Sequence, residues 1–581
     1  MEAQVRQCQN CKKDFTIESE DFNFYEKIKV PPPTFCFDCR LKRKASYLNP
    51  RTLFRSICEK CSKNIISMYP PESTYQVFCN DCWFEERGGW IEYGKDYDFS
   101  RNFFEQFFDM YNKIPAMNLK QNPTNKNARY SNFTYNNTNV YLSYMVRKSE
   151  DIFYSKQVFP GNKACLDSEV IHENERGYEL VFSSRNYDSR FLVRSNECVE
   201  SGFLFDCSNC INCFMSSSLR NKSYVFRNQQ LTRDKYLKEM ENLSLDSYLM
   251  QEELKKEFFD LCEKAIYRFA VIKNSDSCTG DFIENSKNAK YSFNLESTEN
   301  SKYLIFGSNT IHDSYDALCI GDNQSSYEIT DCGGGSNKIM FCFGVSTCHE
   351  LTYCAMSKNI RNCFGCVGLE NKQYCILNKQ YSKEEYEALL PKIINHMNEM
   401  PYTDKKGNIY KYGEFFPMEF SPFPYNESLA YEEFLMTKEE AEMEGYVWRE
   451  REKKEYKPTI KSNELPDRLT DTEDSILNEA IACPNMGHMD TQCTVAYRIM
   501  PDELRFYRLM KIPLPRFCPN CRYYERKKWK NPYKLWRRGC MCDKDSHSHG
   551  KEKCKIEFET SYAPDRTEIV CCEKCYQQEV Y

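Results

Sequence analysis

The sequence predicts a mainly β, multidomain protein in which pairs of zinc ribbons at both ends flank a two-part β-solenoid with helical caps. Three observations carry this prediction. CxxC motifs gather at both ends of the 581-residue chain, the two end segments are related by duplication, and the middle has a regular short repeat. A chain of this length is too long for one hydrophobic core, so several domains are expected.

The expected domain boundaries follow the changes in pattern along the chain. We expect paired ribbons, a helical connector, a first solenoid part, a helical insert, a second solenoid part, a helical and extended linker, and a diverged second ribbon pair. In that order, these segments are 1–90, 91–125, 126–232, 233–270, 271–381, 382–482 and 483–581. Ser382 followed by Glu385 is typical of a capping box and predicts a helix after the second solenoid part.

Four CxxC motifs in the N-terminal segment predict two metal sites. Each CxxC lets two thiolates from one tight turn bind one ion, and two such turns complete a tetrahedron. Four cysteines close the coordination shell, so these sites are structural rather than catalytic. The predicted ligands are Cys8, Cys11, Cys36 and Cys39 for one ion, and Cys58, Cys61, Cys79 and Cys82 for the other.

The C-terminal segment is a diverged copy of this ribbon pair. The Pro-rich stretch before Cys36 matches the one before Cys518 at an offset of 482 residues. Beyond an insertion in the second copy the offset becomes 493, which maps Cys82 onto Cys575. The duplication therefore predicts two further ions, so that the chain would hold four structural Zn²⁺.

The two copies differ at several ligand positions. The ligands expected for the third ion are Cys483, Cys493, Cys518 and Cys521. His488 competes for the place of Cys483. The ligands expected for the fourth ion are Cys554, Cys572, Cys575 and either Cys540 or Cys542. His547 and His549 lie in a polar insertion and are interpreted as solvated, with a second ion nearby as the alternative.

A 12-residue period runs through the middle of the chain, starting with Tyr291, Tyr303 and Tyr315. Apolar or small residues at alternate positions predict a five-residue strand with one face inward, and the residues between strands favour turns. One strand and one turn are too short to enclose a core. We therefore expect two strands and roughly 24 residues per coil, with an antiparallel meander as the alternative.

A looser array precedes this one, and the two arrays end alike. Asn212-Cys213-Phe214 matches Asn362-Cys363-Phe364 at an offset of 150 residues. Cysteines of the arrays, such as those of Cys207-x2-Cys210-x2-Cys213, have no second CxxC to pair with. We interpret them as small buried thiols, because free cysteine packs like a small apolar residue. Another metal site is the alternative.

Positive charge is concentrated in the ribbon segments, although the whole chain carries −6. Residues 36–63 hold eight Lys and Arg against two acids, and residues 483–541 hold thirteen against four. Cations neutralise phosphates and aromatic rings stack on unpaired bases, so nucleic acid is the first candidate partner. The predicted contacts are Arg40, Lys42, Arg43, Lys44, Arg522, Arg526, Lys527, Lys528, Trp529, Lys530, Arg537 and Arg538. The alternative is that the aromatic residues pack the ribbon connectors and the charges are solvated.

Two other functions compete with nucleic-acid binding. A protein partner could bind the extended surface of the solenoid. An enzyme could use acidic residues in a solenoid groove, for which the candidates are Asp313, Asp316, Asp322 and Asp331. Aspartate is an ordinary turn residue, however, and the chain has no Gly-rich phosphate loop, nucleophile elbow or HExxH motif. The sequence therefore predicts a non-enzymatic zinc-binding adaptor.

The chain has no apolar run of about 18 residues, the length that would span a membrane, and its first residues lack an apolar stretch of signal-peptide length. We therefore expect a cytoplasmic protein without a membrane partner. Thiols stay reduced in that compartment, so 33 cysteines favour metal sites or buried thiols over disulfides. The sequence gives no indication of an oligomeric state.

Three stretches of the sequence carry a resemblance to a known group of proteins. They are Val30-Pro31-Pro32-Pro33-x-Phe35-Cys36, Asn362-Cys363-Phe364-Gly365-Cys366 and Tyr562-Ala563-Pro564-Asp565-Arg566. The chain resembles, over most of its length, a group of functionally uncharacterised zinc-ribbon proteins from small-genome, uncultivated bacteria. The resemblance implies zinc ribbons around a Cys-rich repeat and brings no activity with it.

Overall fold

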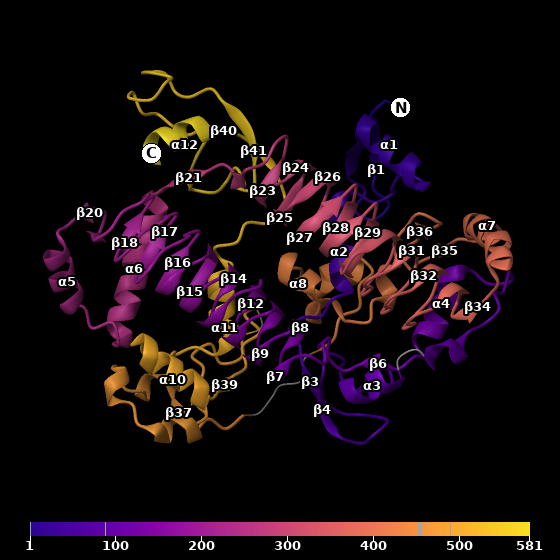
Figure 1. Ribbon diagram of the computed structural model, residues 1–581, viewed down its shortest axis with the longest axis horizontal. Coiled ribbons are helices and arrows are strands. Elements are labelled where there is room, and N and C mark those ends of the chain that lie inside the picture. The colour runs from indigo at the N-terminus through magenta and orange to yellow at the C-terminus, as the bar shows by residue number, and fades with distance from the viewer. Residues whose placement is uncertain (1, 87–88, 451–455, 489, 581) are drawn as a thin grey trace.

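A computed structural model describes residues 2–86, 89–450, 456–488 and 490–580. Within these ranges the protein is mainly β and multidomain, with two large sheets of 14 and 13 strands and twelve α-helices (Figure 1). We name the strands of the 14-stranded sheet the first array and those of the 13-stranded sheet the second array. The ribbon helix α2 (Phe37–Ser46) packs on strands β28 (Tyr315–Gln324) and β29 (Tyr327–Cys332) in the middle of the second array.

Short strands make up the two arrays. Those of the first array are β7 (Lys126–Arg129), β8 (Asn132–Tyr135), β9 (Thr138–Tyr141), β10 (Tyr144–Arg147), β11 (Glu150–Phe153), β12 (Lys156–Val158), β13 (Lys163–Leu166), β14 (Glu169–His172), β15 (Glu175–Ser184), β16 (Tyr187–Val193), β17 (Gly202–Phe205), β18 (Phe214–Ser217), β19 (Val225–Phe226) and β20 (Gln229–Gln230). Those of the second array are β22 (Ile272–Lys273), β23 (Gly280–Glu284), β24 (Lys287–Lys290), β25 (Ser292–Glu296), β26 (Thr298–Lys302), β27 (Ile305–His312), β28 (Tyr315–Gln324), β29 (Tyr327–Cys332), β30 (Ser336–Met340), β31 (His349–Thr352), β32 (Arg361–Phe364), β33 (Gln373–Ile376) and β34 (Lys379–Gln380).

Most strands within each array pair in parallel, and the 12-residue repeat sets their register. Leu180 lies opposite Leu192 in the first array, and Leu351 lies opposite Cys363 in the second. Each 12-residue repeat of the first array gives one strand to each of two stacks, as β9 pairs with β11 while β10 pairs with β12. The expected 24-residue coil is therefore wrong, and so is the antiparallel meander.

The backbone bends every third residue, which explains how so short a repeat can hold two strands. Residues such as Phe203, Asp206 and Asn209 have φ of 53–54°, in the left-handed region. A residue in that region turns an extended chain sharply, so one 12-residue repeat can make four short sides. The 12-residue period is visible in the sequence, whereas the three-residue period within it is not.

Small residues fill the space between the two stacks of the first array. Val140, Ile152 and Cys165 belong to one buried cluster, and Asn and Ser side chains complete the interior. The amide of Asn186 donates to the Oδ1 of Asn174, 2.9 Å away and one repeat earlier, while its own Oδ1 accepts from the next repeat. These ladders satisfy the buried polar groups and hold successive repeats in register.

Helices pack on the arrays and form the ribbon modules. They are α1 (Ser19–Ile28), α2 (Phe37–Ser46), α3 (Asn80–Glu86), α4 (Phe103–Tyr111), α5 (Arg233–Glu241), α6 (Tyr248–Lys264), α7 (Lys383–Glu399), α8 (Leu429–Glu433), α9 (Lys438–Met443), α10 (Pro501–Met510), α11 (Pro519–Lys527) and α12 (Glu573–Val580). The predicted capping box begins α7, where Ser382 and Glu385 bond each other's backbone N–H. Phe258 of α6 packs on Phe203, with 5.7 Å between the ring centroids, so α6 covers strands β17 and β18 of the first array.

The other strands are short and lie mostly in the ribbons and linkers. They are β1 (Gln4–Gln7), β2 (Asp14–Ile17), β3 (Phe54–Ile57), β4 (Asn64–Ser67), β5 (Val77–Phe78), β6 (Ala116–Met117), β21 (Ile266–Arg268), β35 (Tyr402–Thr403), β36 (Ile409–Tyr410), β37 (Ile460–Lys461), β38 (Ile481–Ala482), β39 (Ala496–Tyr497), β40 (Trp536–Gly539), β41 (Glu557–Thr560) and β42 (Ile569–Cys571). The hairpins β1–β2 and β3–β4 carry the first cysteines of the N-terminal ribbons at their turns.

Each ribbon pair contacts both arrays. In the N-terminal pair, Arg40 of α2 binds Asp316 of the second array, while Asn132 of the first array donates to the carbonyl of Asn49. In Figure 1 the first ribbon, with β1, α1 and α2, lies near strands β26–β29, whereas β3 and β4 of the second ribbon lie near β7. The first ribbon helix therefore packs on the array that is more distant in sequence.

The C-terminal ribbon pair repeats the arrangement with the arrays exchanged. Arg522 of α11 binds Asp167 of the first array, and Ser561 donates to Asp281 of the second array. Strand β42 also pairs with β21 just before the second array, as β5 pairs with β6 before the first. The duplication detected in the sequence thus relates two halves that are crossed in space.

Candidate metal centres

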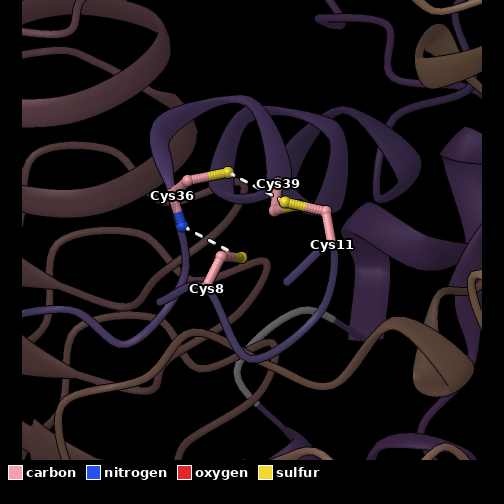
Figure 2. A group of neighbouring side chains, drawn as sticks. All are labelled: Cys8, Cys11, Cys36 and Cys39. Carbon is pink, nitrogen blue, oxygen red and sulfur yellow. Dashed lines mark hydrogen bonds between the residues drawn. The ribbon is translucent and has the colours of Figure 1, made fainter. Parts of the chain in front are cut away.

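The first centre lies between the β1–β2 turn and the start of α2 (Figure 2). The Sγ atoms of Cys8, Cys11, Cys36 and Cys39 all lie within 4.8 Å of one another. Those of Cys11 and Cys36 are 3.7 Å apart. An ion with four thiolates at about 2.3 Å has tetrahedral edges of about 3.8 Å. The spacing therefore fits a closed four-cysteine site.

The same type of hydrogen bond recurs in each of the four ribbons. In each, the backbone N–H of the third ligand donates to the sulfur of the first. The four bonds are Cys36 to Cys8 at 3.3 Å, Cys79 to Cys58 at 3.2 Å, Cys518 to Cys483 at 3.4 Å and Cys572 to Cys540 at 3.2 Å. A donor aimed at the sulfur stabilises the thiolate, which is the form that binds metal.

The second centre contains Cys58, Cys61, Cys79 and Cys82 within the same 4.8 Å limit. The Sγ atoms of Cys61 and Cys79 are 3.8 Å apart. Burial opposes ionisation of the Cys58 thiol, but backbone N–H donors of Cys79, Cys61 and Lys60 outweigh it and lower the pKa of Cys58 to about 6. This thiol is thus prepared to bind metal at neutral pH.

The third centre uses Cys483 in the place that Cys8 holds in the first. It groups Cys483, Cys493, Cys518 and Cys521, and the Sγ atoms of Cys518 and Cys521 are 3.5 Å apart. The competing ligand His488 does not belong to the group, because its side chain is 71% exposed and faces Asp490. The duplication alone could not find this ligand, because Cys8 maps onto Asp490.

The fourth centre contains Cys540, Cys554, Cys572 and Cys575. The hydrogen bond from the Cys572 N–H shows that Cys540 has the role of Cys58. Cys554 comes from the insertion and replaces Cys61, which maps onto an aspartate. Of the two alternatives left open by the sequence, the structure brings Cys540 and not Cys542 to this group.

Cys542 lies instead in a fifth group with His547, His549 and Cys575, whose donor atoms are again within 4.8 Å of one another. Cys575 thus belongs to two groups. The interpretation of His547 as solvated is wrong, because only 7% of this residue is exposed. A sequence signal existed, because three of the chain's seven histidines lie in this module.

Cysteines inside the arrays behave differently. Cys207, Cys213 and Cys366 are buried, and each bonds through its sulfur to a backbone carbonyl two residues earlier. Burial raises the pKa of Cys165 to about 12. In the part of the chain that the structure describes, no array cysteine joins a candidate metal group. All 33 cysteines are free thiols, without disulfides.

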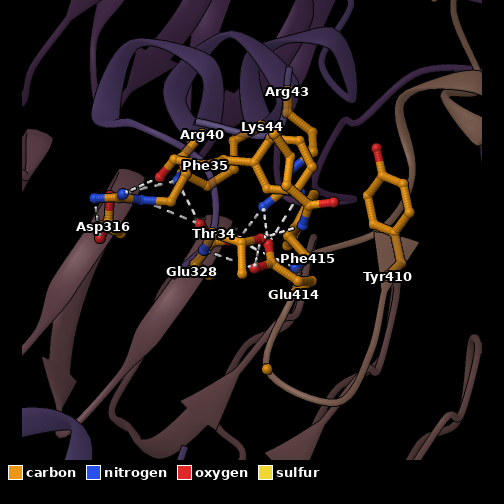
Figure 3. Close-up of polar contacts among 12 residues, drawn as sticks. Thr34, Phe35, Arg40, Arg43, Lys44, Asp316, Glu328, Tyr410, Glu414 and Phe415 are labelled. Carbon is orange, nitrogen blue, oxygen red and sulfur yellow. Dashed lines mark hydrogen bonds and ion pairs between the residues drawn. The ribbon is translucent and has the colours of Figure 1, made fainter. Parts of the chain in front are cut away.

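Three of the four cations of α2 are buried beside carboxylates (Figure 3). The guanidinium of Arg40 bonds both oxygens of Asp316 at 2.9 and 3.0 Å. Arg43 lies 2.9 Å from Glu328 and 3.3 Å from Glu414. Lys44, 1% exposed, lies 3.7 Å from Glu328 and 3.8 Å from Asp316. Internal carboxylates surround the side chains of Arg40, Arg43 and Lys44. These side chains therefore have no surface that the predicted nucleic acid could contact.

The equivalent cations of α11 are also buried. Arg522 and Arg526 both lie 2.9 Å from Asp167, and Arg526 lies 3.4 Å from Glu179. Lys530, three residues after the end of α11, bonds Glu433 at 2.6 Å with 5% of its side chain exposed. These three residues are therefore unavailable to a phosphate for the same reason. The carboxylate partners come from sequence-distant strands and linkers, so no local pattern could reveal them.

The other predicted contacts are more accessible but are already engaged. Lys42 bonds Glu444 at 2.8 Å, and Lys528 bonds Glu525 with 63% of its side chain exposed. Arg537, 80% exposed, pairs with Glu557, Arg538 donates to the carbonyl of Ala563, and Lys527 is half-buried.

Trp529 is half-buried and packs against α6. Its ring stacks on Phe259, with 5.1 Å between centroids and 1° between the ring planes, and it also contacts Phe258. Both phenylalanines belong to α6. The predicted base-stacking face of this tryptophan is therefore covered by a helix of the same chain.

The four acidic candidates of the solenoid groove do not gather at one point. Asp316 binds Arg40, Asp313 bonds Lys27 at 3.0 Å, and Asp331 pairs with Lys120. Asp322 is exposed. Three of the four carboxylates thus hold separate elements of the fold together.

Comparisons with known proteins add little. No family model matches the chain, and no curated protein matches it. Among solved structures, the chain is similar to that of a candidate acetyltransferase from Desulfovibrio desulfuricans G20, with 9% identity over 44% of this chain and 67% of that one. The TM-score of 0.09 is too low to carry an argument about fold or function. No helix among the described residues is both long and apolar enough to cross a membrane.

Proposed function

We propose that this protein is a non-enzymatic, zinc-binding scaffold whose ribbons fasten two β-solenoids, so that the solenoid surfaces can bind protein partners. One observation carries the proposal. Each ribbon pair contacts both arrays, and buried ion pairs such as Arg40–Asp316 and Arg522–Asp167 hold the contacts. The cations of the ribbon helices thus serve the architecture of the chain.

Four closed centres of four cysteines each support Zn²⁺ as the structural metal. Four thiolates at these spacings suit Zn²⁺, which binds tetrahedrally and has no redox chemistry. Because all four coordination positions are filled by cysteine, none is left for a substrate. Metal binding provides much of the folding free energy of such small modules. Zinc would therefore stabilise the ribbons and, through them, the relative placement of the arrays.

We assign to protein partners the outer ladders, the exposed rows of asparagines that stack from one repeat to the next on the outside of the arrays. Asn209 bonds Asn221 at 2.7 Å in the first array, and Asn359 bonds Asn371 in the second at 2.5 Å. All four side chains are exposed. The two pairs are equivalent under the 150-residue offset, so one chain presents two related faces.

Nucleic-acid binding through the ribbon connectors is the competing proposal, and it has less support. The accessible cations Lys528 and Arg537 each already have a carboxylate partner. Binding would need those pairs to open, or cations elsewhere on the surface to take part. An enzyme of the solenoid groove has less support still, because Asp313, Asp316 and Asp331 are held in ion pairs.

Affinity purification from host lysate, with and without nuclease, tests the proposal. A specific protein partner should persist after nuclease treatment. The Asn209→Asp and Asn359→Asp double variant should reduce its capture about tenfold, because it places charge on both ladders, whereas Lys528→Ala should not. Aspartate tolerates the left-handed backbone of these positions, so the fold should survive.

Loss of the captured partner upon nuclease treatment, with recovery of single-stranded RNA or DNA, would overturn the scaffold proposal in favour of nucleic acid. Unchanged capture by the asparagine double variant would move the contact away from the ladders. Metal content and the midpoint of thermal unfolding are measured on each variant, so that misfolding is not mistaken for lost binding.

A further inference from the structure

We propose that the fourth and fifth groups form one two-metal centre in which the Cys575 thiolate bridges two zinc ions. One ion would be bound by Cys540, Cys554, Cys572 and Cys575, and the other by Cys542, His547, His549 and Cys575. The proposal concerns the C-terminal module alone and does not depend on what the scaffold binds.

His547 is oriented for metal by a carboxylate. Its Nε2 lies 3.1 Å from an oxygen of Glu579, and its Nδ1 lies 3.1 Å from the sulfur of Cys542. A carboxylate accepts hydrogen bonds, so the neutral imidazole carries its proton on Nε2. The lone pair of Nδ1 therefore faces the group. A histidine ligand whose other nitrogen binds a carboxylate is a common arrangement in metal sites.

His549 is oriented in the same sense by the backbone. Its Nδ1 lies 2.6 Å from the carbonyl oxygen of Glu552, and its Nε2 lies 3.3 Å from the sulfur of Cys542. A carbonyl can only accept, so the proton sits on Nδ1 and the lone pair of Nε2 faces the group. The two histidines present different ring nitrogens to the same point.

When both imidazoles are neutral, hydrogen bonding leaves one nitrogen of this cluster without a donor. Two acceptor nitrogens face Cys542, whose thiol has one proton and can satisfy only one of them. A cation at the common point satisfies both nitrogens and the thiolate. Metal bonds of about 2.0–2.1 Å to nitrogen and about 2.3 Å to sulfur give N···S edges of roughly 3.5 Å, close to the observed separations.

A shared Cys575 follows from the number of donors. The two groups contain seven donor residues, while two separate four-coordinate ions need eight. The Cys575 sulfur lies within 4.8 Å of the other three donors in each group, so one thiolate can serve both ions. The residue belongs to α12, and the other donors of the fifth group come from the insertion that follows β40. The bridging Cys575 thiolate would therefore connect this insertion to α12 through the second zinc ion.

Native mass spectrometry of the full-length protein, purified with zinc and without chelator, tests the number of ions. We expect five zinc ions in the wild-type protein and four in the His547→Ala and His549→Ala double variant. The matched control is His488→Ala, because His488 lies exposed in the third ribbon outside every group. This variant should keep five. Four ions in the wild-type protein, unchanged in the double variant, would overturn the proposal.

Cadmium-113 NMR of the cadmium-loaded full-length protein tests the shared thiolate. Two cadmium ions on one sulfur are two bonds apart, so two of the five resonances should show coupling to each other. That coupling should vanish in the histidine double variant, while the three resonances of the other ribbons stay in place. Five resonances without any cadmium–cadmium coupling would overturn the bridge.

Discussion

Arg40 of the first ribbon helix binds Asp316 with two hydrogen bonds, of 2.9 and 3.0 Å, across 276 residues of sequence. Arg522 of the third ribbon forms the equivalent ion pair with Asp167, at 2.9 Å. The two arginines correspond under the ribbon duplication, and the two aspartates lie in the two different arrays. A ribbon helix in each half therefore holds the array of the other half, so neither half can be removed without exposing charges in its counterpart.

Breaking the first pair should destabilise the protein strongly. Arg40→Ala leaves the Asp316 carboxylate buried without its main partner, a change that typically costs about 3–5 kcal/mol. Chemical unfolding followed by circular dichroism measures the effect. Lys27→Ala is the matched control, since Lys27 pairs with Asp313 at the surface with 58% of its side chain exposed. Surface pairs contribute about 0–1 kcal/mol. Similar losses in both variants would contradict this account.

Removing one ribbon ligand should release one ion. Cys58→Ser replaces a thiolate whose neighbours already favour its ionised form, so zinc content should fall by one per chain. Cys207→Ser is the control, because Cys207 is buried inside the first array, where its sulfur bonds the carbonyls of Phe205 and Ser216. This variant should keep its zinc. Elemental analysis of both proteins, purified without chelator, measures the zinc content per chain. Loss of zinc from the control would indicate a metal site inside the first array.

Truncating an aromatic residue on the covered face of the second array should be costly. Phe341 is fully buried and stacks on Tyr353, with 4.8 Å between ring centroids. Phe341→Ala should therefore lower the free energy of unfolding by about 3–5 kcal/mol. Lys338→Ala, three residues earlier on an exposed ladder, should change it by less than about 0.5 kcal/mol. Urea denaturation of the two variants compares them directly.

The sequence contained the ligand pattern and the 12-residue period because both depend on local spacing. A thiol pair on one turn can bind metal only at CxxC spacing, so Cys8 and Cys11 could be assigned directly. The three-residue bend was missed because left-handed residues such as Phe203 and Met215 are not turn formers. The stacked hydrogen bonds of the array hold them in this conformation, and no single-residue preference predicts it.

The basic connectors resemble a nucleic-acid surface in the sequence for another physical reason. A cation beside aromatic residues looks the same in sequence whether it faces a phosphate or an internal carboxylate. Glu328 and Asp167 lie far from the connectors in sequence, and only the crossed packing brings them to Arg43 and Arg526. The duplication held a usable signal, because an arginine of the ribbon helix and a buried acid of the array both recur in the second half.

Glu179 should make stability depend on pH. Burial raises the pKa of its carboxyl to about 7, although Arg526 opposes the shift. Because the folded pKa lies above the unfolded value of about 4.3, the folded state binds the proton more tightly. The stabilisation is present below that unfolded value and is lost as pH rises towards 7. Glu179→Gln should remove this dependence, which thermal unfolding between pH 5 and 8 measures. A difference in stability between wild type and Glu179→Gln that stays constant from pH 5 to pH 8 would contradict the shift.

Trp529 distinguishes a packing connector from a nucleic-acid surface. Its ring is stacked on Phe259 of α6, so Trp529→Ala should lower the free energy of unfolding by about 2 kcal/mol, less than for a fully buried aromatic residue. Binding of single-stranded RNA at low salt, measured per folded molecule, should not change. If a base stacked on this ring, affinity would instead fall by about 1–3 kcal/mol. Lys528→Ala is the control on the exposed side of the same connector, and it should alter neither quantity by more than a few tenths of a kcal/mol. A variant of Trp529 that stays as stable as the wild type but loses affinity would show that the stack with α6 opens to receive nucleic acid.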